Sequence, residues 1–223
     1  MPHISYSELK DWAFCAFYHK LTRVDKIDGF KGNAFTAFGT AMHSVCEKKL
    51  LQEEVSDDFF IQEFEGCLEA LDDDVEVDDR LVTDMREQGK QIIPEIQDAL
   101  DDYFDEYEVL AVEMPLMEPI ETEEGYKFKG FIDAIVTTPD GKVHIFDWKT
   151  CSWVETHFAL LKRTAKKNRV EFFRVTSGPK KTQNALKLMR TALYNIKKKR
   201  YIKNRLSCTG GYGCKFYNTE HCP

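Results

Sequence analysis

Four residues in the middle of the chain have the types that hydrolysis of a phosphodiester needs. Asp147 and Lys149 stand two positions apart, so on a β-strand their side chains point to the same face. Asp133 and Glu113 lie in two preceding apolar segments. Carboxylates bind Mg²⁺ or Mn²⁺, and a nearby lysine can position water or neutralise developing charge. The set indicates a catalytic metal site; the simpler alternative is an Asp–Lys ion pair at a strand end.

Three of the seven cysteines gather near the C-terminal end of the sequence. Cys208, Cys214 and Cys222 lie in a glycine-rich segment with the spacing C-x5-C-x7-C. Thiolates grouped in this way are typical ligands of zinc or of an iron–sulfur cluster, and Cys15 is the candidate fourth ligand. The other three are predicted to be ordinary buried or half-buried thiols: Cys46, Cys67 and Cys151.

The formal net charge of −7 conceals an asymmetry along the chain. Residues 151–223 contain 17 lysines and arginines against three glutamates, whereas residues 1–150 contain 14 basic and 35 acidic residues. A locally basic surface attracts phosphates whatever the total charge, although a solvated charged face would give the same counts. The candidate DNA contacts cluster around a predicted hairpin turn: Lys162, Arg163, Lys166, Lys167 and Arg169.

A second basic run follows, at 197–200 with Lys203 and Arg205. It adjoins aromatic residues that could stack on the bases of a single strand or simply pack: Tyr194, Tyr201 and Phe216.

The first half of the chain has helical periodicity. Helices are predicted at 5–22, capped by Ser5 or Ser7, and at 34–52, 57–71 and 79–105, the last kinked or interrupted at Pro94. Strand-like segments then follow between turn signals, at 108–120, 126–137 and 142–149, and predict a three-strand antiparallel meander. A hairpin of 156–163 and 169–176 and a basic helix at 180–199 complete the pattern.

Helices followed by a meander and a closing helix predict an α+β fold. We expect a single domain with a helical portion at 1–107, a sheet with its closing helix at 108–200, and a cysteine-rich tail at 201–223. Hydrophobic residues are 43% of the chain, which suffices for a packed core. No apolar run could span a bilayer and no secretory signal is evident, so a cytoplasmic protein without a membrane partner is expected.

Two motifs resemble the paired core motifs of PD-(D/E)XK nucleases in their RecB-like branch: GFIDAIV at 130–136 and HIFDWKT at 144–150. That branch has an upstream helix with a glycine, a histidine four residues on and often an acid; Gly39, His43 and Glu47 match it. The resemblance implies a restriction-endonuclease-like core, with a central mixed sheet flanked by helices.

The same resemblance implies a role for each matching residue. It makes His43, Asp133 and Asp147 metal ligands, with the backbone carbonyl of Trp148 as a candidate fourth. Lys149 matches the catalytic lysine, and Glu113 and Glu47 match further acids.

The segment around Cys15 resembles the N-terminal helix of RecB-like nucleases with an iron–sulfur domain, such as the AddB and the CRISPR-associated RecB-like exonucleases. Their pattern implies that Cys15, Cys208, Cys214 and Cys222 bind a 4Fe-4S cluster that holds the chain ends together. The spacing in this tail is longer than the usual C-x2-C-x5-C, and Ala16 stands where a proline is common. Zinc on the same four cysteines is the alternative.

Together these features predict an Mg²⁺- or Mn²⁺-dependent DNA nuclease, an exonuclease acting on single-stranded ends in recombination, repair or replication. A helicase or recombination protein would be its partner, and a phage source, with the host cytoplasm as location, would suit so compact an enzyme.

One family element lacks a counterpart in the sequence. RecB-like nucleases carry a Q-x-x-x-Y helix after the D-x-K strand, whereas residues 151–155 leave room neither for that helix nor for a crossover to a parallel strand. The alternatives are therefore a non-catalytic DNA-binding module that keeps the fold, and a zinc-stapled protein-interaction domain.

Overall fold

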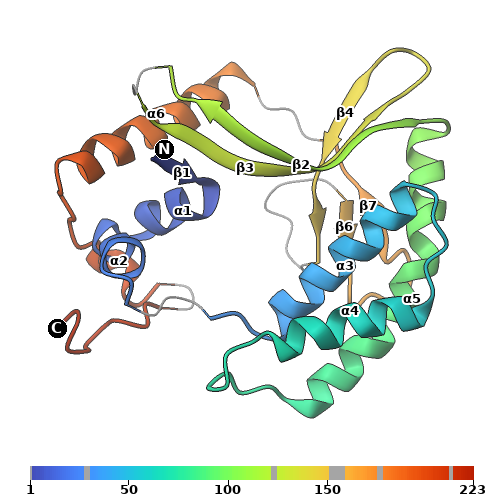
Figure 1. Ribbon diagram of the computed structural model, residues 1–223, viewed down its shortest axis with the longest axis horizontal. Helices are drawn as coiled ribbons and strands as arrows, with labels where there is room; N and C mark the ends of the chain where they lie inside the picture. The colour runs from blue at the N-terminus through green and yellow to red at the C-terminus, as the bar shows by residue number, and fades with distance from the viewer. Residues whose placement is uncertain (1, 28–30, 122–124, 151–158, 175–177, 211–212) are drawn as a thin grey trace. The chain divides into compact units, whose positions relative to one another are not determined.

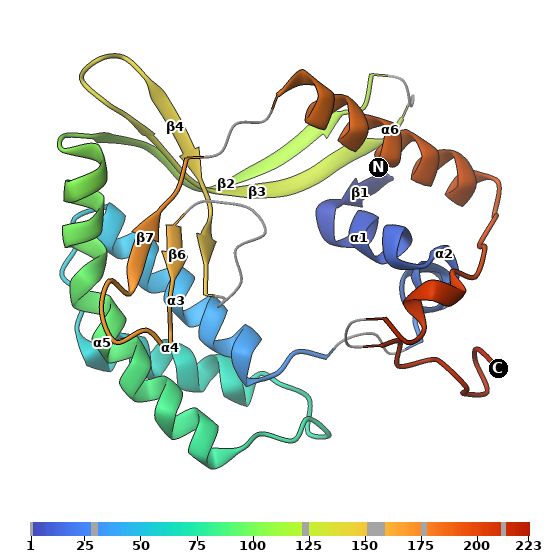
Figure 2. The same cartoon turned by 180° about the vertical axis from the view of Figure 1, so that it is seen from behind.

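The computed structural model describes residues 2–27, 31–121, 125–150, 159–174, 178–210 and 213–223 (Figures 1 and 2). The chain forms two compact units, each assembled from segments far apart in the sequence. The first unit contains Met1–Phe30, Pro115–Gly130 and Ser177–Pro223, and the second contains Lys31–Met114 and Phe131–Thr176. The single-domain organisation stays a prediction.

Three helices of the second unit, predicted from periodicity, are confirmed: α3 (Ala34–Leu50), α4 (Asp57–Glu69) and α5 (Asp79–Phe104). Asn33 begins α3 with a capping box, in which its side chain accepts a hydrogen bond from the Thr36 backbone N–H. The predicted interruption at Pro94 is wrong, because α5 continues through this residue. Buried isoleucines on both sides of the proline anchor the helix, and this packing offsets the lost backbone hydrogen bond.

The predicted meander is present: β2 (Glu108–Pro119) and β4 (Val143–Phe146) both pair with β3 (Lys127–Thr137), and β4 is antiparallel to it. Alternate residues of β3 and β4 face the core of the second unit, including Ala134, Val136 and Phe146.

The predicted strand 142–149 is divided in two. It ends at Phe146, and the chain resumes after Asp147 as β5 (Trp148–Lys149) in a second sheet with β6 (Ala159–Leu161) and β7 (Val170–Phe172). Trp148 is one of the largest fully buried side chains. Burying this side chain favours the departure of the chain from the first sheet after Phe146. The structure thus has two sheets where a single central mixed sheet was predicted.

The predicted hairpin is confirmed, since β6 and β7 are antiparallel. However, β5 and β6 run parallel, joined only by residues 150–158. The expectation that this connection is too short for a parallel strand is therefore wrong, and the parallel pairing is short, with Trp148 beside Ala159 and Lys149 beside Leu160. Residues 151–158, on which the missing Q-x-x-x-Y helix would fall, lie outside the described part of the chain.

In the first unit, the predicted helix 5–22 is broken. Ser5 caps α1 (Tyr6–Phe14), but Cys15 has extended backbone (φ −162°) before α2 (Ala16–His19) and η1 (Lys20–Val24). An unpredicted strand, β1 (His3–Ser5), pairs parallel with the first residues of β3. The predicted basic helix is present as α6 (Pro179–Lys197), and η2 (Arg205–Ser207) follows it. Helix α6 packs with α1 around buried Leu9 and Leu193 (Figure 1).

Helices and mixed sheets together confirm the predicted α+β, restriction-endonuclease-like class. None of the helices in the described residues is long and apolar enough to cross a membrane.

Candidate functional site

Elements of the second unit bring together the residues that the sequence analysis selected. Helix α3 contributes His43, β2 contributes Glu113, and β3 contributes Asp133. The ligand atoms of these three side chains all lie within 4.8 Å of one another. A histidine nitrogen and two carboxylates at this spacing form a set that can hold a divalent cation.

The His43 ring is oriented by the backbone of β5. Its Nε2 lies 2.9 Å from the carbonyl oxygen of Trp148. Because a carbonyl oxygen can only accept a hydrogen bond, Nε2 carries a proton, and Nδ1 is the ring nitrogen that can offer a lone pair to a cation. That Nδ1 lies 3.4 Å from a carboxylate oxygen of Asp133 and 3.8 Å from one of Glu113. Metal-binding histidines typically donate their second ring N–H to a carbonyl in this way.

Asp133 is the most buried member of the set, with its side chain 10% exposed. Its Oδ2 accepts a hydrogen bond of 2.8 Å from the backbone N–H of Trp148. This bond ties β3 to β5 at the point where the chain leaves the first sheet. Asp133 therefore contributes both charge to the site and a link between the two sheets.

Glu113 has an unusual backbone conformation for a residue within a strand, with φ at +44°. Non-glycine residues in the left-handed region are uncommon, and those that occur concentrate at functional sites. Burial raises the pKa of the Glu113 carboxyl above its usual range, and the charge of Asp133 raises it further. A cation bound among these groups would relieve the repulsion between the two carboxylates.

The side chains of Asp147 and Lys149 form an ion pair, although Asp147 lies between β4 and β5 and not on one strand with Lys149. Burial raises the pKa of Asp147, and the Lys149 ammonium opposes that shift. The Lys149 Nζ also donates to the Trp148 carbonyl oxygen at 3.3 Å. This carbonyl, a candidate metal ligand in the sequence analysis, thus accepts hydrogen bonds from His43 and Lys149.

The ion pair alone would also satisfy the simpler alternative of a salt bridge at a strand end. That alternative does not explain why the side chains of His43, Glu113 and Asp133 also converge, because an Asp147–Lys149 salt bridge needs none of them. From the sequence, Asp147 was expected to be a metal ligand and Glu113 a less certain acid. In the structure Glu113 is grouped with His43 and Asp133, whereas Asp147 pairs with Lys149.

Gly39 lets α3 approach the end of β5 closely. A Cβ atom at this position would lie 3.1 Å from Oγ1 of Thr150, the residue after Lys149. This is tighter than about nine in ten contacts of real Cβ atoms, so Thr150 would have to move by a few tenths of an ångström. The glycine of the G-x-x-x-H pattern therefore has a packing role beside the site.

The four cysteines expected to bind a cluster line one small cavity in the first unit: Cys15, Cys208, Cys214 and Cys222. The Cys15 Sγ accepts a hydrogen bond of 3.2 Å from the Asn204 backbone N–H. Burial raises the pKa of the Cys214 thiol, and the other three thiols add to the shift. The thiols lie close enough together to influence each other electrostatically.

Two other cysteines are placed as ordinary thiols. Cys46 is buried in the core of the second unit, where burial and then Asp133 raise its pKa well above the usual range. Cys67 is half-buried, and Cys151 lies outside the described residues.

Three of the five residues predicted to contact DNA are held by contacts within the second unit. Lys162 pairs with Glu171 at 2.6 Å, and Arg163 donates to Gln88 on α5 at 2.7 Å while lying over the Phe35 ring. Arg169 hydrogen-bonds Gln91, and its backbone N–H donates to Glu95 at 2.6 Å. Lys166 and Lys167 are exposed.

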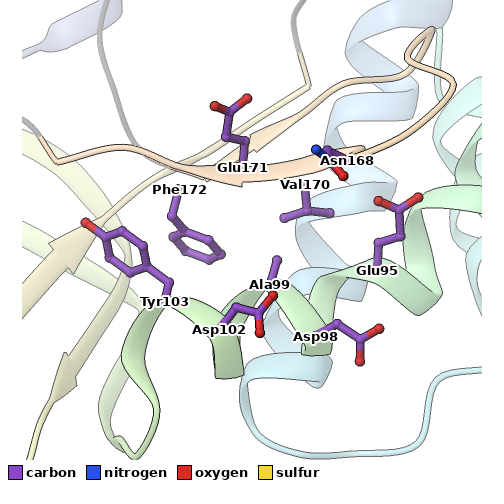
Figure 3. A pocket seen from close by; sticks show the side chains of 9 residues that line it. All are labelled: Glu95, Asp98, Ala99, Asp102, Tyr103, Asn168, Val170, Glu171 and Phe172. Atoms are coloured by element: carbon purple, nitrogen blue, oxygen red, sulfur yellow. The ribbon is translucent and has the colours of Figure 1, made fainter.

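A hollow on the second unit lies between α5 and the β6–β7 hairpin (Figure 3). Acidic side chains dominate its polar lining, with Tyr103 stacked on Phe172 at 5.1 Å between ring centres. The carboxylates that line it are Glu95, Asp98, Asp102 and Glu171. None of the candidate catalytic residues lines this hollow, and its charge would repel a phosphate backbone.

Comparison with models of protein families identifies a relationship for this chain. The family model described as the PD-(D/E)XK nuclease superfamily matches residues 3–194, which covers the whole second unit and much of the first. No curated protein matches the chain.

Proposed function

The chain belongs to the PD-(D/E)XK nuclease superfamily, and from that premise we propose that it is a RecB-like exonuclease that hydrolyses single-stranded DNA ends with Mg²⁺ or Mn²⁺. The observation that carries this proposal is the convergence of His43, Glu113 and Asp133 within 4.8 Å, beside Lys149. Hard oxygen ligands with one imidazole suit both ions.

The residues present fit a divalent ion. Two carboxylates and an imidazole nitrogen lie close together, and all three are atoms of the kind that bind a divalent ion. A divalent ion held there would supply the Lewis acidity that cleavage of a phosphodiester requires.

The side chains around this set have separable roles. The Trp148 carbonyl holds the His43 ring in one orientation through the bond to Nε2. Lys149, with its side chain 48% exposed, can direct its ammonium at a substrate oxygen or at the attacking water, and can neutralise charge as it develops. Asp147 pairs with this ammonium and limits its motion.

We assign a 4Fe-4S cluster to the cysteine cavity, with zinc as the alternative. Four cysteines are a ligand set that either group accepts, since structural zinc takes four thiolates and a 4Fe-4S cluster takes one for each of its irons. The cluster is preferred because the segment around Cys15 resembles the N-terminal helix of RecB-like nucleases with an iron–sulfur domain.

The proposed biological setting is DNA recombination, repair or replication, with a helicase or recombination protein as partner. This setting rests on the resemblance to RecB-like nucleases alone. The site residues support the chemistry directly, whereas a shared fold does not identify a pathway.

The test is cleavage of end-labelled single- and double-stranded DNA by anaerobically purified protein with Mn²⁺. Lys149→Ala should reduce the rate by about 100-fold or more, the usual effect of removing a group that stabilises charge in the transition state. Lys142→Ala is the matched control, because Lys142 likewise pairs with an aspartate two residues earlier, in an exposed turn.

Fragment lengths will separate exonuclease from endonuclease action. Wild-type protein that binds DNA but cuts neither substrate would instead identify a non-catalytic DNA-binding module. Equal rates for wild type and Lys149→Ala would remove the lysine from the mechanism.

A further inference from the structure

The sequence around helix α6 is strongly basic. From 172 to 219 it contains no aspartate or glutamate. Within that interval, α6 and the residues after it carry exposed cations: Lys180, Lys181, Lys187, Arg190 and Lys197–Arg200. A segment with many cations and no acid of its own produces a positive local field despite the negative total charge.

The helix has a buried face and an exposed face. Met189, Ala192 and Leu193 are buried against the core of the first unit. A helix turns about 100° per residue, so positions seven apart nearly align. Lys180, Lys187 and Tyr194 therefore fall within about 40° of one another and at least about 100° from the buried side chains. The exposed face therefore presents a row of two ammonium groups and one aromatic ring.

Neutral hydrogen-bonding residues fill the spaces along this row. Gln183, Asn184 and Thr191 are exposed and lie within about 40° of its line. Amide and hydroxyl groups of this kind contact phosphate and sugar oxygens without reading sequence. We use the name "α6 row" for Lys180, Gln183, Asn184, Lys187, Thr191 and Tyr194.

Tyr194 is 51% exposed, although the adjacent Leu193 is buried. The Arg200 guanidinium lies over its ring, 5.7 Å from the centre. An exposed aromatic ring beside an arginine is a surface on which a nucleic-acid base can stack. A tyrosine at this place does little for the core.

The hairpin at 162–169 is less suited to hold the substrate. Its arginines are engaged by Gln88, Gln91 and Glu95 of α5, and Lys162 by Glu171. The nearby hollow is acidic (Figure 3). No acid lies within α6, and thus the α6 row has the more favourable charge for a polyanion.

We propose that the α6 row binds single-stranded nucleic acid, with Lys180 and Lys187 on the phosphates and Tyr194 stacked on a base. This inference rests on the proposed nuclease function, since it names the surface that holds the substrate strand. A single strand is the ligand because its bases are open to stacking, whereas a duplex hides them.

The experiment measures affinity apart from cleavage. Fluorescein-labelled oligo(dT) is titrated with the full-length protein without divalent metal, at several NaCl concentrations, and anisotropy is recorded. Lys180→Gln/Lys187→Gln should weaken binding and reduce the slope of log K against log salt by about 1.4, or about 0.7 for each lost phosphate contact on a single strand. Tyr194→Ala should weaken binding at least about fivefold with the slope unchanged, and Tyr194→Phe should restore it.

Lys166→Gln/Lys167→Gln is the matched control, because it removes the same charge from the other exposed basic surface. All these side chains are exposed, and thermal melting will verify that each variant folds. Equal affinity of the wild type and the α6 variants, or a larger loss in the hairpin variant, would overturn the proposal. So would equal binding of a duplex with no effect of Tyr194→Ala.

The two proposals can fail separately. Wild-type protein that binds through α6 but cuts no DNA supports the inference and removes the catalytic function. A protein that cuts DNA normally and loses nothing with the α6 variants refutes the inference alone.

Discussion

Binding of a divalent ion should stabilise the protein, and the replacement Asp133→Asn should abolish that stabilisation. Without metal, the carboxylates of Asp133 and Glu113 and the imidazole of His43 lie with their ligand atoms within 4.8 Å of one another, and the two carboxylates repel each other. A cation removes this repulsion in the folded state and gains little in the unfolded chain, so binding favours folding. Asparagine keeps an oxygen that can accept the hydrogen bond from Trp148 but removes the charge.

The magnitude follows from mass action. Mn²⁺ at 100 times its Kd stabilises the folded state by about 2.7 kcal/mol. For a chain of this size, each kcal/mol moves Tm by about 2–4 °C, so the expected increase is about 5–11 °C. Asp133→Asn should show a small fraction of that increase, and its Tm without metal should equal or exceed that of the wild type.

Differential scanning fluorimetry over a Mn²⁺ series, in buffer treated to remove metals, measures the effect. Asp140→Asn is the control, because Asp140 is a carboxylate in an exposed turn and should leave the wild-type response intact. An unchanged wild-type Tm at 10 mM Mn²⁺ (roughly 100-fold above a Kd of about 0.1 mM) would refute the reasoning. So would a full increase in Asp133→Asn.

Three further predictions concern glycines and the cysteine cavity. Gly89→Ala should lower the free energy of unfolding in urea by about 1–3 kcal/mol, because the new Cβ atom would lie 2.2 Å from the buried Phe60 ring. Gly66→Ala is the control: its Cβ atom would meet nothing within 4 Å, so it should raise that free energy by about 0.5–1 kcal/mol. Gly39→Ala should leave stability unchanged or higher but lower kcat several-fold, because it displaces Thr150 by a few tenths of an ångström beside the site. Anaerobically purified protein should contain about four irons per chain, and replacing any one cysteine of the cavity with serine should remove them; one zinc in a colourless protein would favour the alternative.

Much of the fold could be predicted from local patterns. The predicted starts of α3, α4 and α5 agree with the structure, where the caps are Asn33, Ser56 and Asp78. Such starts are predictable because capping is a local interaction between a side chain and nearby backbone N–H groups. The Asp147–Lys149 ion pair joins residues only two positions apart, so it too is a local feature, although Asp147 lies between β4 and β5 and not on one continuous strand.

Features that depend on distant partners were not predictable. The break at Cys15 interrupts a sequence that has helical periodicity, but the Cys15 thiol and the carbonyl of Phe14 both meet the segment 204–207 from the other end of the chain. Likewise, the basic residues of the hairpin look like phosphate contacts until α5 is folded beside them, when Gln88 and Glu95 become their partners. Charge counts along a sequence cannot separate these two outcomes.

The division of the predicted strand at Asp147 connects the fold with the chemistry. Where the chain leaves β4 for β5, the Trp148 N–H is satisfied by the Asp133 carboxylate, and the Trp148 carbonyl by His43 and Lys149. One peptide segment thereby fixes a carboxylate, an imidazole and an ammonium at once. It follows that removing the Asp133 carboxylate with alanine would leave the Trp148 N–H without its partner and would disturb the sheet junction as well as the metal set. Replacing Lys149 with alanine removes its side-chain bond to that carbonyl and its ion pair with Asp147 but leaves the backbone pairing of β5 with β6 in place, so it tests the chemistry more directly than Asp133→Ala does.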